Sequence, residues 1–194
     1  MSARRPLAIA AALAAAAIAP VSASAATTWF GSSLNHEPAN AGSTCTPAVS
    51  CTRVGSYYPG TSGRVKAPAT GTLVKVRVLA QQAGSFRVVV VRLRNVSANH
   101  KHGQAKLVAR SRVLRAKGPG PDAVTVPVES FTLSMRVHRG DSIGIETRRN
   151  VFEYCTDGTP GQLTFAPVLS GTAFRSANGL DTCLLTVQGV IKVA

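Results

Sequence analysis

The stretch Phe86-Arg-Val-Val-Val-Val-Arg-Leu93 decides the fold. Consecutive side chains of a β-strand point to opposite faces, so the run of valines from Val88 to Val91 makes both faces of this segment apolar. A strand with one face in water alternates apolar and polar residues instead. We therefore predict a central strand over 86–93 that is covered on both sides.

The segments around this stretch show that alternation. Val74, Val76 and Val78 alternate with Lys75 and Arg77, and the same period of two recurs over 131–138 and 185–193. Shorter candidate strands cover 107–114, 124–128, 142–147 and 162–168, and turns rich in glycine and proline separate them. This pattern predicts an all-β fold: a single antiparallel β-sandwich of about eight strands, jelly-roll-like in topology. The sandwich would span 64–194, and a loop-rich N-terminal segment over 26–63 would pack on it.

The first residues have the pattern of a secretory signal peptide. Arg4 and Arg5 precede an apolar run over 7–19, and Ala23-Ser-Ala25 is a small-residue cleavage site. We expect export by the Sec route, cleavage after Ala25, and a mature protein that is secreted, extracellular or cell-wall-associated. No later stretch reaches the ~18 apolar residues of a transmembrane helix.

Four cysteines allow three disulfide pairings. Cys45 and Cys51 are separated by a short loop, while Cys155 ends one predicted strand and Cys183 begins the last one. Sequence proximity favours Cys45–Cys51 with Cys155–Cys183, whereas crossed pairings would require the N-terminal loop to lie against Cys155 or Cys183. The spacing does not fit a zinc site, so we expect no metal and no cofactor.

The chain is strongly basic, with 22 Lys and Arg against 8 Asp and Glu and a net charge of +14. Such a charge favours anionic partners. Several basic residues lie two apart and so share one face of a strand, and an outer sheet face would carry a basic stripe for a polyanion if those strands were neighbours. An ordinary solvated sheet face gives the same pattern, and there is no specific nucleic-acid motif. The stripe residues are Lys75, Arg77, Arg92, Arg94, Arg110, Arg112 and Arg136.

Two other groups of residues suggest different chemistry. Trp29, Tyr57 and Tyr58 would form a small aromatic platform for a sugar beside the first disulfide, unless Trp29 packs onto the sandwich. A glycan-active hydrolase would need paired carboxylates near the Cys155–Cys183 link. The candidates for that role are Glu146, Glu153, Asp157 and Asp181. The same acids would otherwise balance nearby arginines.

Four segments of the chain resemble a group of secreted β-sandwich proteins from high-GC Gram-positive soil bacteria. They are Phe30-Gly-Ser-Ser-Leu34, Cys51-Thr-Arg53, Ala67-Pro-Ala-Thr-Gly71 and Val137-His-Arg-Gly-Asp-Ser-Ile-Gly-Ile145. The resemblance implies an extracellular sandwich and carries over no activity and no catalytic residue.

From these observations we expect a non-enzymatic secreted module that binds anionic or polysaccharide cell-surface material through a basic sheet face. The alternatives are a glycan-active hydrolase and a purely structural extracellular domain.

Overall fold

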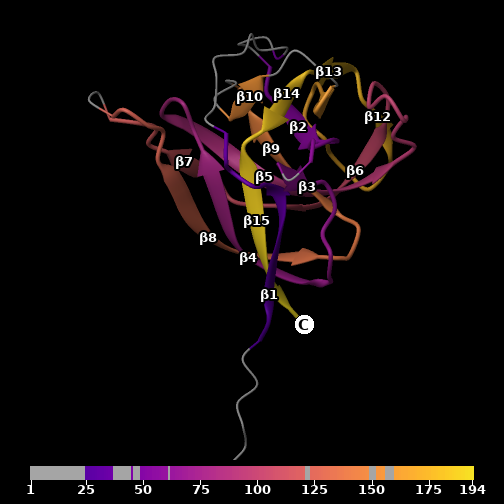
Figure 1. The fold of residues 1–194 in the computed structure, drawn as a ribbon. Helices are drawn as coiled ribbons and strands as arrows, with labels where there is room; N and C mark the ends of the chain where they lie inside the picture. Colours follow the sequence, from indigo (N-terminus) through magenta and orange to yellow (C-terminus); the bar gives the residue numbers. More distant parts are fainter. Residues whose placement is uncertain are drawn as a thin grey trace, which may run out of the picture.

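A computed structural model describes residues 25–36, 45, 49–60, 62–120, 123–148, 152–155 and 160–194. Over these residues the chain is all-β, with fifteen strands and no helix (Figure 1). No helix long and apolar enough to cross a membrane occurs in the described ranges. The predicted signal peptide lies outside them, apart from Ala25, and stays a prediction.

The strands have the following bounds: β1 Thr27–Ser32, β2 Cys51–Gly55, β3 Gly63–Arg64, β4 Gly71–Leu79, β5 Gly84–Arg94, β6 Gln104–Arg110, β7 Leu114–Ala116, β8 Val128–Val137, β9 Ser142–Thr147, β10 Glu153–Cys155, β11 Gln162–Phe165, β12 Arg175–Ser176, β13 Gly179–Asp181, β14 Cys183–Leu185 and β15 Val187–Val193.

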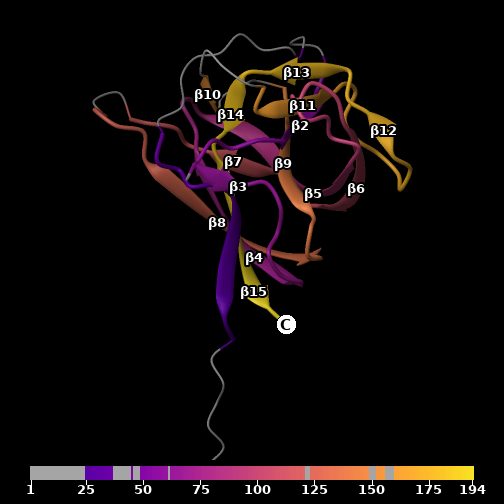
Figure 2. The same cartoon turned by 45° about the vertical axis from the view of Figure 1, so that its right-hand side comes forward.

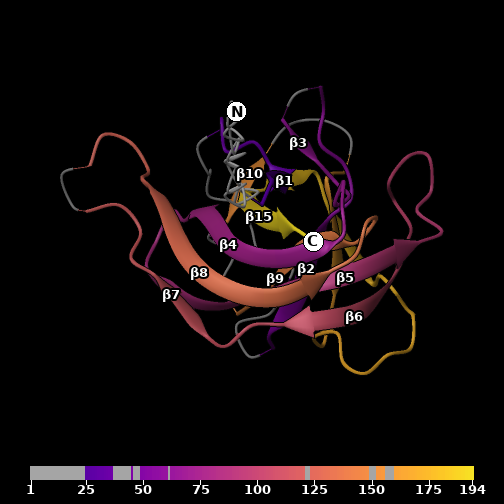
Figure 3. The same ribbon diagram turned by 90° about the horizontal axis from the view of Figure 1, so that it is seen from below.

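These strands form three antiparallel sheets. Sheet 1 has the order β3-β1-β15-β4-β8, and sheet 2 has the order β12-β6-β5-β9-β2-β11-β13 with β7 paired to β5. Figure 3 shows β4 and β8 as long curved strands side by side, with β5, β6 and β7 in the neighbouring layer. The third sheet is the β10–β14 ribbon, which lies at the end of the molecule opposite the start of β1 (Figure 2).

The prediction of a single sandwich of about eight strands is therefore wrong in its count of strands and sheets. Six of the fifteen strands have only two or three residues, which is too short to show a period of two. The predicted strand over 124–128 is also absent except for its last residue, and Val124 is 95% exposed. The candidate over 107–114 is divided between β6 and β7, while β9 has the predicted bounds.

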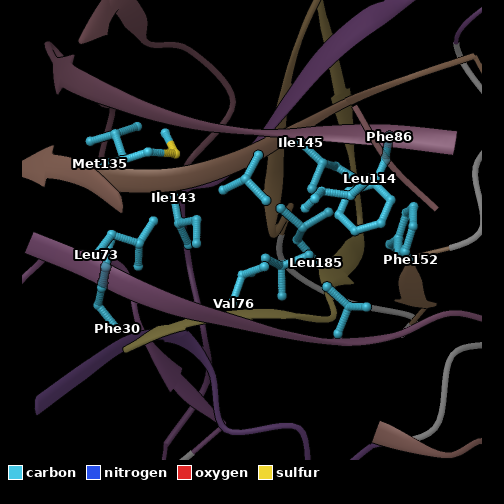
Figure 4. Packing of buried hydrophobic residues seen from close by; sticks show 14 of the residues in the cluster. Phe30, Leu73, Val76, Phe86, Leu114, Met135, Ile143, Ile145, Phe152 and Leu185 are labelled. Atoms are coloured by element: carbon cyan, nitrogen blue, oxygen red, sulfur yellow. The ribbon is translucent and has the colours of Figure 1, made fainter. Parts of the chain in front are cut away.

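Strand β5 is covered on both faces, as its run of valines predicts. Val88 and Val90 are fully buried in the core between the two large sheets, which Figure 4 shows filled by side chains such as Phe30 and Val76. The alternate valines of β5 are fully buried in a second core on the other face of sheet 2. Each such side chain contributes roughly 1.5–3 kcal/mol to folding. The valines of β5 therefore stabilise both cores.

Both predicted disulfides are present. Cys45 is bonded to Cys51, and Cys155 is bonded to Cys183. The second pair lies directly opposite across β10 and β14, so it links the two strands of the ribbon. Disulfides persist in oxidising compartments, and the chain therefore has the chemistry of a protein outside the reducing cytosol.

Tyr58, which follows β2, is a buried polar residue that lies against β2, β3 and the end of β14. Its side chain is 7% exposed, and its hydroxyl donates a hydrogen bond of 3.1 Å to the carbonyl oxygen of Leu185. Gly55 and Gly63 make room for it, because a Cβ at either position would come within 3 Å of the Tyr58 side chain. Burial raises the pKa of the Tyr58 phenol well above its ordinary value.

We expect Tyr58→Phe to change how stability depends on pH. The folded protein holds the Tyr58 proton more tightly than the unfolded chain, so stability is lost as the pH rises above the unfolded value of about 10. The variant should lose about 1 kcal/mol at neutral pH, because one buried hydrogen bond is removed. Above about pH 10 the difference should shrink. Urea unfolding of both proteins across this range would show it, and a difference independent of pH would contradict the assignment.

Candidate functional site

Cationic side chains gather on the outer face of sheet 1, the face turned away from the core. The cross-strand register places Thr72 of β4 opposite both Arg136 of β8 and Lys192 of β15, and it places Arg77 opposite Gln188. Directly opposed residues of paired strands point to the same side. Arg64 of β3 is opposite Gly31 of β1, which is itself opposite Gln188, and Lys75 lies two residues before Arg77 on β4. We define the basic face by the five cations on this side of the sheet: Arg64, Lys75, Arg77, Arg136 and Lys192.

The basic face is open to solvent. Four of its cations are exposed, and only Arg77 is half-buried, with its guanidinium donating to Oε1 of Gln188 over 2.9 Å. Their polar neighbours are threonine and serine side chains, among them Thr72 and Thr132. With strands about 4.8 Å apart and alternate residues about 7 Å apart, the neighbouring cations of β4, β8 and β15 are spaced by roughly 7–10 Å. Arg64 is three strands away from Arg77, at a distance of about 14 Å.

No Asp or Glu side chain of the described residues lies on the basic face, because all five described acidic side chains are engaged elsewhere. Their partners are the backbone N–H groups of Lys117 and Gly118 for Glu129, Arg92 and His138 for Asp141, Arg110 for Glu146, Arg53 for Glu153 and the N–H of Cys183 for Asp181. The positive charge of the face is therefore not neutralised by these groups.

Trp29 lies within the basic face, on β1 between β3, which carries Arg64, and β15, which carries Lys192. It is opposite Val190 in the β1–β15 register and is half-buried, and the guanidinium carbon of Arg64 lies 4.7 Å from the centroid of its ring. A cation at this distance is attracted by the π-system. Arg64 therefore covers part of the ring that the sequence suggested for sugar stacking, and Trp29 is part of the cationic surface rather than an open platform.

The structure divides the predicted stripe between two sheets. Lys75, Arg77 and Arg136 lie on the basic face, but Arg92 and Arg94 belong to β5 of sheet 2. Arg92 binds the Asp141 carboxylate at 2.8 and 2.9 Å, and Arg94 donates to Gln104 and lies 3.9 Å from the ring centroid of Phe174. One continuous stripe is therefore not formed.

The other two stripe residues are also on sheet 2. Arg110, at the end of β6, binds the Glu146 carboxylate through Nε and Nη2 at 3.0 and 2.6 Å. Arg112 is exposed in the segment between β6 and β7. Neither side chain shares a surface with the basic face.

The aromatic platform does not assemble from the two tyrosines. Tyr58 is buried, as described above, because its ring fills the space beside Gly55 and Gly63. Tyr57 is half-buried and stacks on His100 with 4.7 Å between ring centroids. Trp29 is on sheet 1, so the three side chains do not present one surface.

The acidic residues named for a hydrolase lie in separate environments. Glu146 is on sheet 2 beside Arg110, and Asp157 lies outside the described residues. Glu153 is 1% exposed and forms an ion pair with Arg53, which is fully buried. Burial lowers the pKa of Arg53 to about 10, while the nearby Asp181 charge opposes this shift. The Glu153 carboxylate is thus part of a buried charged pair.

Glu153 and Asp181 do approach each other beside the second disulfide. Their carboxylate oxygens and the sulfurs of Cys155 and Cys183 all lie within 4.8 Å of one another. In the disulfide the sulfurs are bonded to each other and are not thiolates, which are the cysteine ligands of zinc. Glu153 is buried with Arg53 as its ion-pair partner, and Asp181 lies close by. This arrangement fits a cluster of charged groups with a structural role.

Two members of the basic face were not among the predicted residues. Lys192 occupies a polar position of the last alternating segment, so its exposure to solvent could be predicted from the sequence. The position of β15 between β1 and β4 could not be predicted. Arg64 is in a strand of two residues, where no periodicity exists.

Comparisons with family models, curated proteins and solved structures found no match to the chain. The resemblance noted from the sequence therefore stays a prediction.

Proposed function

We propose that the protein is a secreted, non-enzymatic module that binds a linear anionic glycopolymer of the cell surface through the basic face. One observation carries this proposal: five cations share the outer face of sheet 1, and every described Asp and Glu side chain is engaged elsewhere. An uncompensated positive surface attracts and retains polyanions by charge.

The shape of the surface suits a polymer. The cations lie on four of the five strands of sheet 1 rather than around one cavity, so a long chain can contact several of them at once. Over β15, β4 and β8, a repeating anion such as a phosphodiester or a uronate would meet a cation every roughly 7–10 Å. Small threonine and serine side chains lie between the cations of β4 and β8 and leave the polymer backbone access to the sheet there, whereas Trp29 and Val190 lie between Arg64 and Lys75.

The connectivity is consistent with a jelly-roll topology for the principal strands, which the sequence suggests. In sheet 1 the order β1-β15-β4-β8 and in sheet 2 the order β2-β9-β5-β6 place strands from the two ends of the chain beside each other. That interleaving is expected of two Greek keys wrapped into a double sheet. The other strands are then additions to a double sheet of eight principal strands, and the basic face is one of the outer surfaces of that double sheet.

A binding experiment tests the proposal. The mature protein is mixed with insoluble wall material rich in anionic polymer and with a neutral polysaccharide, at about 0.05 M and about 0.5 M salt. We expect retention on the anionic material at low salt only. Retention on the neutral polysaccharide, or binding that persists in high salt, would contradict the proposal.

A further inference from the structure

A second candidate site lies on sheet 2, in a pocket of about 750 Å³ where β5 begins and β9 ends. The segment between β6 and β7 and the segment after β11 contribute Val113 and Val168 to its lining. This volume is within the range of roughly 300–1,000 Å³ that is usual for small-molecule sites. The pocket shares no residue with the basic face.

The lining carries an excess of positive charge. Arg87, Arg110 and Arg148 face one carboxylate, that of Glu146. Glu146 is 7% exposed and accepts hydrogen bonds from both Nε and Nη2 of Arg110, so the charges of these two side chains offset each other. Two arginines then remain, Arg87 and Arg148.

Neither of these arginines forms an ion pair within the part of the chain that the structure describes. Arg87 lies opposite Glu146 in the β5–β9 register, and its Nη1 donates to the carbonyl oxygen of Ser111 over 3.0 Å. That bond holds the guanidinium in place. Arg148 directly follows β9 and is exposed. Guanidinium groups bind carboxylates, sulfonates and phosphates by paired N–H donors.

The uncharged lining combines apolar side chains with the hydroxyl groups of Ser50, Ser85 and Thr147. Val113 is one of the few exposed large hydrophobic residues of the described chain, with 47% of its surface in solvent, and it lies in this pocket with Val168 and Phe86. An exposed apolar side chain beside two uncompensated cations favours a ligand that has an anionic head and an apolar body.

We propose that this pocket binds a small organic anion, with its anionic head on Arg87 and Arg148 and its apolar body on Val113 and Val168. The inference is independent of the proposed function, because it concerns the other large sheet and a monomeric ligand rather than a polymer.

The test uses the fluorescent probe anilinonaphthalene sulfonate and its neutral analogue N-phenylnaphthylamine, which has the same ring system without the sulfonate. Wild-type protein should bind the sulfonate saturably and the neutral analogue at least about tenfold more weakly, as expected for loss of charged hydrogen bonds. Arg87→Gln/Arg148→Gln should weaken sulfonate binding by at least about tenfold. Arg148→Gln alone, at an exposed position, should weaken it about threefold, so the test does not depend on a variant that fails to fold.

The matched control is Lys75→Gln/Arg77→Gln, which removes the same charge from the basic face. It should bind the sulfonate like the wild type, and the pocket variants should bind anionic polymer like the wild type. Sulfonate binding that is unchanged in both pocket variants, or that falls equally in the control, would overturn the assignment.

Discussion

Arg53→Met is expected to lower the free energy of unfolding by about 3–5 kcal/mol. Arg53 is fully buried, and its partner Glu153 is 1% exposed. The carboxylate of Asp181 lies within 4.8 Å of that of Glu153. Removal of the guanidinium leaves two negative groups close together, one of them out of contact with water. Such an uncompensated charge costs more than the intact pair contributes.

The double variant Arg53→Met/Glu153→Leu separates this effect from a loss of packing. It removes both buried charges together, so we expect it to recover most of the stability lost in Arg53→Met. Arg94→Met is the matched control, because Arg94 is exposed and contacts Gln104 and Phe174. It should cost no more than about 1 kcal/mol. Urea unfolding at neutral pH gives all three values, and a double variant less stable than Arg53→Met would contradict the account.

The second large effect is expected on polymer binding. Five cations in contact with a polyanion should give an affinity that falls by about 100-fold between about 50 and 200 mM salt, because each contact releases a counterion. A variant with four of them replaced by glutamine should lose at least about 100-fold in affinity at the lower salt concentration, and its salt dependence should be nearly flat. The four positions are Lys75, Arg77, Arg136 and Lys192.

A control variant of equal net charge shows whether position matters. In this control variant, glutamine replaces four exposed cations that lie outside the basic face: Lys101, Arg112, Lys117 and Arg139. We expect this variant to keep most of the affinity and a salt dependence close to that of the wild type, measured by titration against an anionic polymer at several salt concentrations. Equal losses in the two variants would mean that the overall charge, and not the basic face, holds the polymer.

Local sequence patterns predict those parts of the fold that depend on neighbouring residues. Period-two alternation and the valine run identify β4, β5, β8 and β15, because they record directly which face of a strand is buried. The disulfides follow from short spacing and from strand ends. The short strands could not be predicted, since β3, β10 and β12 have two or three residues whose pairing depends on distant segments.

The candidate site is predictable only in part for the same reason. The spacing of Lys75 and Arg77 places them on one face of a strand. It does not show that β4 pairs with β8, or that β5 belongs to the other sheet. The pocket depends still more on topology. Arg87 and Arg148 come together only because β5 pairs with β9, and no local pattern indicates that pairing.

The most direct test of the central claim is a lysine footprint of the protein with and without a linear anionic polymer at low salt. Each lysine is labelled with an amine-reactive acetylating reagent, and its modification is measured by mass spectrometry. We predict that Lys75 and Lys192 become protected by the polymer, while Lys101 and Lys106, on the side of sheet 2, stay reactive. Protection of Lys101 and Lys106 with Lys75 and Lys192 still reactive would contradict binding through the basic face.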